Sequence, residues 1–167
     1  YKLDMNKCIL ERYISANYQS YNEMNGDNIN DVFVDESKRI WLANYPTGIT
    51  VIDYRYENYH WMKHSMGNKQ SIVNDQVHAV IEDSDGDLWF GTSNGISLYN
   101  SGTGEWHSFL SSFNHQLKDK NHIFITLCEV SPGIIWAGGY TSGIYKINKA
   151  DLSVEYFSPY LLSHINM

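Results

Sequence analysis

Three short segments of this chain repeat the same pattern of residues, and this repetition constrains the fold more than any other feature. In each copy a tryptophan is followed by two small or apolar residues and then, six or seven residues after the tryptophan, by a Gly-Ile pair. The tryptophans are Trp41, Trp89 and Trp136, so the copies lie 48 and 47 residues apart (89 − 41 and 136 − 89). A period of this length indicates one repeated supersecondary unit and is far too long for a coiled coil.

The middle copy shows most clearly which unit is repeated. Four runs rich in β-branched, aromatic and alternating apolar residues are separated by turn-forming Asp, Asn, Ser and Gly residues. The runs are 77–82, 88–92, 96–100 and 105–110. Four short strands joined by tight turns predict one antiparallel sheet, and repetition of such a sheet at this period predicts the blades of a β-propeller.

Alignment of the three copies predicts how the whole chain is divided. Residues 1–4 match 145–148, which places the start of the chain in the third strand of an earlier blade. Three and a half blades cannot close a ring that typically needs about four to eight. We therefore expect an all-β chain that is part of one larger β-propeller, divided into 1–13 as the end of a blade, 28–63, 76–110 and 123–158 as four-stranded antiparallel blades, and 159–167 as a linker to the next blade.

The middle copy also resembles a known family. Its core at 83–96, Asp-x-x-Gly-x-Leu-Trp-Phe-Gly-Thr-x-x-Gly-Ile, and the preceding residues 68–75 are similar to the two-component regulator propeller repeat and its linker between blades. The outer copies depart from the pattern in their first turns, at 35–39 and 130–133. The resemblance implies the periplasmic sensor region of a hybrid histidine kinase and response regulator, in a protein anchored in the inner membrane.

The resemblance further implies a function in signal transduction, with ligand binding and without catalysis in this segment. Many proteins of the family come from bacteria that use complex carbohydrates, so we expect a carbohydrate ligand, with the kinase elsewhere in the full-length protein. Two alternatives stay open: a structural scaffold for dimerisation, and a propeller lyase or glycoside hydrolase. Glycoside hydrolysis needs two carboxylates across the scissile bond, and the loops between second and third strands contain none.

The predicted ligand-binding residues lie on the face formed by the loops between second and third strands and by the linkers between blades. These segments are rich in Asn, Ser, Thr, Tyr, Gln and His, which can hydrogen-bond and stack with a neutral polyhydroxylated ligand. Surface loops are polar whatever they bind, so composition alone does not separate ligand contacts from solvated residues. The candidates are Asn44, Tyr45, Asn94, Tyr140, His78 and His122.

One segment has the pattern of a metal-binding loop. Residues 83–87, Asp-Ser-Asp-Gly-Asp, carry carboxylates at alternate positions, as at the start of a calcium loop. The terminal glutamate of such a loop would fall at Asn94, so we interpret the segment as a hairpin turn in which Gly86 supplies a positive φ. None of the seven histidines forms a pair at a spacing of two or four residues that we expect to share a face. We expect no metal and no cofactor.

The tryptophans and cysteines have structural interpretations. The three repeated tryptophans are each followed by a small residue, which predicts burial between neighbouring blades. Trp61 and Trp106 fall on predicted outer strands and do not align with each other, so exposure is expected more readily there. Cys8 and Cys128 belong to different blades, which predicts free buried thiols and no disulfide.

Charge and hydropathy limit the partners. The formal net charge is −7 and no patch of Lys and Arg is present, which argues against nucleic acid. No apolar run of about 18 residues occurs, so we expect no membrane contact by this segment. The expected partners are an oligosaccharide ligand and either the remaining propeller blades or a second copy of the chain in a homodimer.

Overall fold

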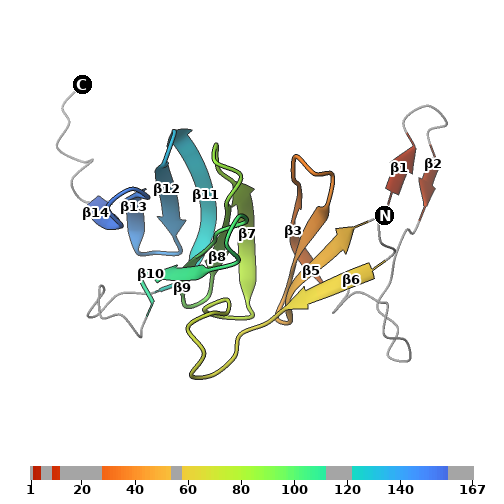
Figure 1. Cartoon of the computed structure of the whole chain (residues 1–167), viewed down its shortest axis with the longest axis horizontal. Coiled ribbons are helices and arrows are strands. Elements are labelled where there is room, and N and C mark those ends of the chain that lie inside the picture. Colours follow the sequence, from red (N-terminus) through yellow and green to blue (C-terminus); the bar gives the residue numbers. More distant parts are fainter. Residues whose placement is uncertain (1, 5–8, 12–27, 54–57, 112–121, 158–167) are drawn as a thin grey trace.

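The computed structural model describes residues 2–4, 9–11, 28–53, 58–111 and 122–157, and in these ranges every regular element is a β-strand (Figure 1). Twelve of the strands form three four-stranded antiparallel sheets, and two form a small separate sheet. The prediction of an all-β partial propeller is therefore confirmed. Within the same ranges no helix is long and apolar enough to cross a membrane.

Each four-stranded sheet is one blade, and its strands follow chain order from the inner to the outer edge. Blade 1 consists of β3 (Ile29–Val34), β4 (Ile40–Asn44), β5 (Gly48–Asp53) and β6 (Asn58–Met62). Blade 2 consists of β7 (Val77–Glu82), β8 (Leu88–Thr92), β9 (Gly95–Tyr99) and β10 (Trp106–Phe109). Blade 3 consists of β11 (Phe124–Ser131), β12 (Ile134–Gly139), β13 (Gly143–Asn148) and β14 (Ser153–Phe157).

The small sheet pairs β1 (Lys2–Asp4) with β2 (Ile9–Glu11) in antiparallel register. These are the segments that the sequence assigns to the third and fourth strands of an earlier blade. The predicted linker at 159–167 lies outside the described residues.

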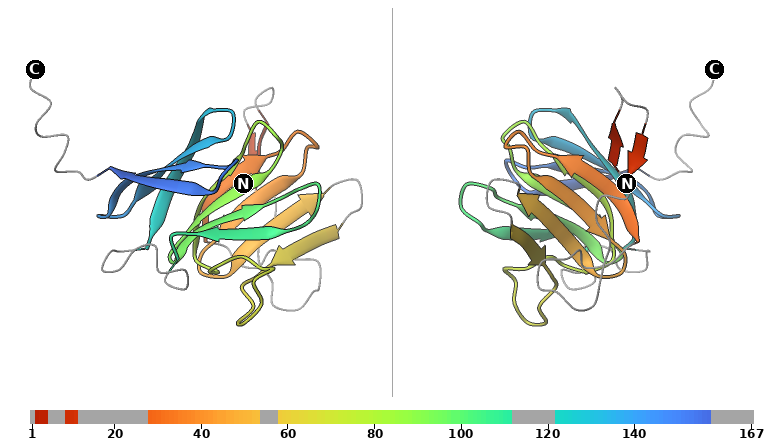
Figure 2. Two further views of the ribbon diagram at one scale, coloured as in Figure 1. Left: turned by 60° about the vertical axis from the view of Figure 1, so that its left-hand side comes forward. Right: turned by 90° about the vertical axis from the view of Figure 1, so that its right-hand side faces the viewer.

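The inner strands of the three blades lie next to one another, as Figures 1 and 2 show. Strand β7 contacts both β3 and β11, so blade 2 is packed between the other two. Each inner strand has a register shift near its start, which leaves one extra residue unpaired at Asn30, His78 and Ile125. Such a β-bulge turns a side chain away from the regular pleat, and the repetition places these three bulges at equivalent points.

Two apolar clusters hold the blades together. Between blades 1 and 2, Trp41 packs with Val80 and Phe90, and its ring centroid lies 6.1 Å from that of Phe90. Between blades 2 and 3, Trp89 packs with Leu127 and its neighbours and stacks on a phenylalanine of its own outer strand. Trp41 and Trp89 are 1% and 0% exposed, which confirms their predicted position between blades.

The other three tryptophans differ in burial for reasons of position. Trp136 stacks on Phe157 at 5.2 Å but is only half-buried, because no described blade covers that side of blade 3. Trp61 is 47% exposed on the outer strand of blade 1. Trp106, whose outer strand makes exposure easier to expect, is 9% exposed and therefore buried. Its ring points towards blade 1 and contacts Phe90, because even an outer strand buries the side chains that face the next blade.

The expectation of a buried thiol is wrong for Cys128, which is exposed. Side chains alternate along β11, so Leu127 points into the cluster with blade 2 while Cys128 lies on the opposite side. Cys8 lies outside the described residues.

Replacing Trp89 by alanine tests the packing between blades. The Trp89→Ala substitution should cost about 3–5 kcal/mol of unfolding free energy, because it empties a large buried site. The Trp136→Ala substitution should cost clearly less, since its indole is already half-exposed. Urea denaturation of both variants measures the difference, and equal losses would contradict the assignment of the two faces.

Candidate functional site

The acidic turn between β7 and β8 is organised by one buried carboxylate. Asp83 Oδ1 accepts hydrogen bonds of 3.0 Å from the backbone N–H groups of Asp85 and Asp87, and Gly86 has a φ of 82°. Asp83 Oδ2 accepts the indole N–H of Trp89 at 2.8 Å. This confirms the interpretation of the segment as a hairpin turn. In blade 1, Asp35 accepts the indole N–H of its own tryptophan in the same way, at 2.9 Å.

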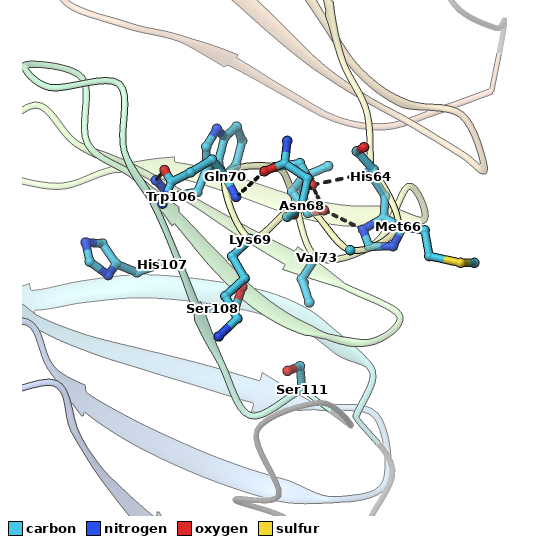
Figure 3. A pocket seen from close by; sticks show the side chains of 14 residues that line it. His64, Met66, Asn68, Lys69, Gln70, Val73, Trp106, His107, Ser108 and Ser111 are labelled. Carbon is cyan, nitrogen blue, oxygen red and sulfur yellow. Dashed lines mark hydrogen bonds between the residues drawn. The ribbon is translucent and has the colours of Figure 1, made fainter.

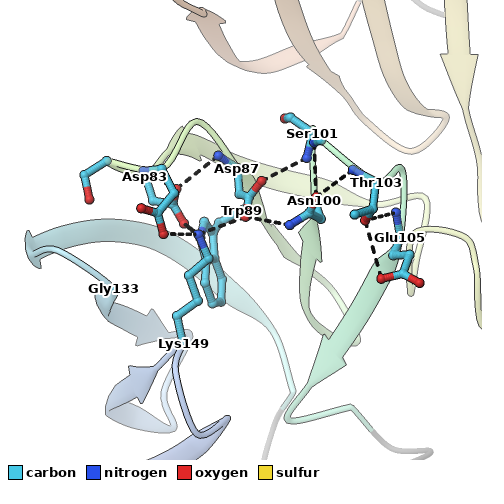
Figure 4. Close-up of polar contacts among 12 residues, drawn as sticks. Asp83, Asp87, Trp89, Asn100, Ser101, Thr103, Glu105, Gly133 and Lys149 are labelled. Atoms are coloured by element: carbon cyan, nitrogen blue, oxygen red, sulfur yellow. Dashed lines mark hydrogen bonds and ion pairs between the residues drawn. The ribbon is translucent and has the colours of Figure 1, made fainter.

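A lysine from the next blade completes this turn. Lys149 extends from the turn between β13 and β14, and its Nζ lies 2.7 Å from a carboxylate oxygen of Asp83 and 2.8 Å from those of Asp85 and Asp87 (Figure 4). The ammonium group stands where the three carboxylates converge. Glu129 of blade 3 adds a second link, since it accepts the backbone N–H of Ser84 at 2.8 Å. The turn therefore fastens blade 2 to blade 3.

The ion pairs shift the pKa of both partners. Burial alone would raise the pKa of Asp83, but hydrogen bonds from Lys149 and Trp89 outweigh it and hold that pKa below its ordinary 3.8. Burial opposes the charge on Lys149, yet the three carboxylates raise its pKa above the ordinary value. Both groups are therefore held in their charged forms. Among the described residues no group of His, Cys, Asp and Glu could hold a metal ion.

Removing the lysine tests this link between blades. Lys149→Met should cost about 3 kcal/mol at neutral pH, because it leaves a buried carboxylate without its counter-ion. Because the pKa of Asp83 is lowered, the wild-type link is fully present above pH 3.8 and is lost as the pH falls through the folded-state value. Urea denaturation between pH 3 and pH 7 should therefore show a difference between wild type and variant that shrinks in acid. Lys146→Met, which breaks an exposed pair with Glu155, is the matched control, and an equal loss there would contradict the special position of Lys149.

The loops between second and third strands lie beside the starts of the inner strands. The N–H groups of Tyr45, Ser93 and Tyr140 donate to the carbonyls of Asn28, Gln76 and Ile123, at 2.8, 2.9 and 2.8 Å. The same bond thus recurs in each blade. It defines one face, here called the loop face, which comprises residues 28–30, 44–47, 74–78, 92–95, 122–125 and 139–142. These are the segments from which the sequence predicts a ligand site.

His78 connects blades 1 and 2 on the loop face. The side-chain amide of Asn30 donates to the carbonyl of Val77 at 3.0 Å and lies 3.3 Å from His78 Nδ1. An amide nitrogen can only donate, so His78 Nδ1 accepts and the ring proton resides on Nε2. That nitrogen lies 2.8 Å from Ser93 Oγ, and the ring of Tyr45 lies 5.9 Å from the imidazole. The bulges of two blades and one loop therefore form a continuous polar network.

The remaining candidates occupy different environments. Asn44 is fully buried at the end of β4, so its side chain supports the loop from within. Asn94 is half-buried and its N–H donates to Thr92 Oγ1 at 3.1 Å. His122 Nδ1 lies 2.7 Å from the carbonyl of Leu110, at the end of the outer strand. Tyr140 is 54% exposed. Of the six candidates, the structure brings Tyr45 and His78 into contact.

The sequence prediction missed Asn30 and Ser93, which complete the network around His78. A signal for Asn30 was present: Asn30, His78 and Ile125 each precede their tryptophan by eleven residues (41 − 30, 89 − 78 and 136 − 125). Reading the repeat position by position would have grouped them. The sequence does not reveal the β-bulge, which turns the side chain at this position towards the neighbouring blade.

The protonation state of His78 is a test of this geometry. Burial lowers its pKa below the ordinary 6.5, so the folded state should lose stability as the pH falls from 6.5 through the lowered value. Nitrogen NMR of the imidazole should show the proton on Nε2. In an Asn30→Ala variant the pKa should rise, because the donor facing Nδ1 is gone. A proton on Nδ1, or an unchanged pKa in the variant, would contradict the network.

Comparison with known proteins supports the assignment of the chain as part of a β-propeller. Residues 71–94, which span the end of a linker and the first two strands of blade 2, match the two component regulator propeller model. The chain thus carries a two-component regulator propeller repeat in blade 2, the middle one of its three described four-stranded blades. No curated protein matches the sequence.

Two solved structures from B. thetaiotaomicron share the fold. One is the extracellular domain of the putative hybrid two component system BT3049, with 20% identity and a TM-score of 0.75 over 88% of this chain and 20% of that one. The other is the extracellular domain of the putative hybrid two component system BT4673, with 21% identity and a TM-score of 0.66 over 93% of this chain and 19% of that one. The chain thus spans about a fifth of the length of these structures.

Proposed function

We propose that this chain is part of the extracellular sensor propeller of a hybrid two-component system. The propeller would lie in the periplasm, and the full-length protein would be anchored in the inner membrane. The observation that carries the proposal is the family match at 71–94. The fold supports the proposal, because the two solved structures that share it are described as extracellular domains of putative hybrid two component systems. The histidine kinase would belong to another part of the full-length protein.

A sensor of this kind needs a ligand-dependent rearrangement and no chemistry in the propeller. A ligand shifts such an equilibrium only by the difference between its affinities for the two arrangements. The loop face suits this role because its bonds cross from blade 1 to blade 2 at His78. A ligand that displaces or stabilises these bonds would act on blade packing directly. We propose no catalytic residue and no cofactor for this segment.

For the ligand we propose a neutral carbohydrate bound at the loop face. Tyr140 offers an exposed ring for stacking, while Tyr45, beside His78, combines a ring with a hydroxyl group. Amide and hydroxyl groups from Asn94 and Ser93 lie on the neighbouring loop and can bond to sugar hydroxyls. No charged group is needed for this recognition.

A structural role in assembly is the second candidate. On the open side of blade 1, Val32 and Val34 are 56% and 51% exposed, and on the open side of blade 3 Trp136 is half-exposed. The residue equivalent to Val32 in blade 2 is Val80, which packs against blade 1 and is 4% exposed. The open sides therefore suit further blades of the full-length protein or a second copy of the chain.

Calorimetric titration of the complete periplasmic region with neutral and acidic oligosaccharides tests the carbohydrate proposal. A neutral ligand should bind with an affinity that changes little between low and high salt. Tyr140→Ala and Tyr45→Ala together should weaken binding about 30-fold or more, because each removes about 1–2 kcal/mol of stacking and hydrogen bonding. Trp61→Ala is the matched control, since it removes an exposed aromatic residue from the outer strand.

Unchanged affinity in a folded double variant would move the site away from these loops. Binding of acidic oligosaccharides alone, with strong dependence on salt, would contradict a neutral ligand. If no oligosaccharide binds and the region is a stable dimer, the assembly role is favoured.

A further inference from the structure

A groove lies on the outer side of blade 2, and the described residues that line it include none of the six candidate residues of the loop face. It has a volume of about 600 Å³ and runs between the linker 64–73 and strand β10, with Ser111 at one end (Figure 3). Small-molecule sites in proteins have volumes of about 300–1,000 Å³. The groove is thus large enough for a ligand of its own.

The linker forms a preformed wall, because its backbone is bonded to itself. The N–H of Asn68 donates to the carbonyl of Ser65 at 3.0 Å, and the Asn68 side chain accepts the N–H of Gln70 at 2.9 Å. The hydroxyl of Ser71 accepts the N–H of Ser65 at 3.1 Å, which closes the loop. A site held in this way needs little ordering when a ligand binds.

Two further bonds fix this wall to blade 2. The N–H of Val73 donates to Ser97 Oγ at 2.9 Å, and the side chain of Gln70 accepts the N–H of Trp106 at 2.9 Å. The second bond places Gln70 across the edge of β10. The linker is therefore joined to β9 through Val73 and to β10 through Gln70, which fixes the position of this wall against blade 2.

The base of the groove is apolar and its rim is polar. Ile72, Val73 and Trp106 back the groove and are 0%, 6% and 9% exposed, so Trp106 presents the most apolar surface of the three. On the rim, the side chain of Lys69 points across the groove towards Ser108 (Figure 3). An apolar base with few polar groups at the edge is the usual composition of a small-molecule site.

Charge defines the ligand further. Among the lining residues that the structure describes, Lys69 carries the one formal charge. None of these described lining residues is a carboxylate, although the chain as a whole has a net charge of −7. The groove is thus a locally cationic site in an acidic protein, which favours an anion.

We propose that this groove binds a small organic acid, with its apolar body against Trp106 and its carboxylate paired with Lys69. The described residues that line it include none of the loop-face candidates, and the site does not depend on the proposed carbohydrate site. The propeller would then respond to a second ligand, which binds at the linker that joins blades 1 and 2.

A pair of matched probes tests this proposal: naphthaleneacetate, and naphthaleneacetamide, which has the same ring system without the charge. NMR titration of the chain should show saturable shifts of the Trp106 indole and the Lys69 amide with the acid. The amide should bind about tenfold more weakly, because it lacks the charge-assisted bond to Lys69. Equal binding of the two probes would overturn the proposal.

Substitutions locate the binding and give the control. Lys69→Gln should weaken binding of the acid about tenfold and bring it to the level of the amide. Lys63→Gln makes the same change in charge at a residue that does not line the groove, and it should leave affinity unchanged. Equal effects of both substitutions, or shifts confined to the open sides of blades 1 and 3, would overturn the site. Tight binding of an apolar peptide through its C-terminus, without binding of the small acid, would also overturn it.

Discussion

The contact on which the blade array depends is the burial of a tryptophan between two sheets with its indole N–H held by an aspartate of the preceding turn. The pair Trp89 and Asp83 shows both parts: the ring fills the space between blades, and the carboxylate fixes its orientation while closing the turn between β7 and β8. Because the N–H is satisfied, the large ring can be buried without the cost of an orphaned donor. Turn, strand pairing and blade packing are thus coupled through one residue pair. Blade 3 lacks the aspartate, since Val130 stands six residues before Trp136, and its tryptophan lies on the open side.

Repetition made most of the fold predictable from the sequence. The period of the tryptophans located three blades, and the turn residues located the strand ends, because both depend on local chemistry that is visible in single residues. The burial of single side chains was harder to predict, since it depends on which side of a blade is covered by a neighbouring blade. Cys128 was misjudged because an inner strand was equated with a buried one, and Trp106 is buried although its outer strand made exposure easier to expect. In both cases burial belongs to single side chains and not to a strand as a whole, because alternate side chains of one strand face different neighbours.

The candidate site was predictable as a face and much less as a set of residues. Loops between second and third strands are recognisable from Asn, Ser and Gly, and the structure bonds each of them to the start of its inner strand. The partnership of Asn30 with His78 depends on two bulges and on the spacing of neighbouring blades, which a single sequence does not display. The groove below linker 64–73 was missed for the same reason, because its walls come from segments about 36 residues apart that the bond between Gln70 and Trp106 brings together.

The ion pairs of Lys149 imply an order in which blades 2 and 3 are completed during synthesis. The three carboxylates of the turn at 83–87 belong to blade 2, but their counter-ion is about 62 residues further along the chain, in the last hairpin of blade 3. During synthesis from the N-terminus, blade 2 can complete its hydrogen bonds while this turn still carries uncompensated negative charge. The charge is neutralised only when the next blade has been made and has docked. Blade 1 does not wait in this way, because Asp35 pairs with Arg39 of its own turn, whereas blade 2 is completed by the blade that follows it in the chain.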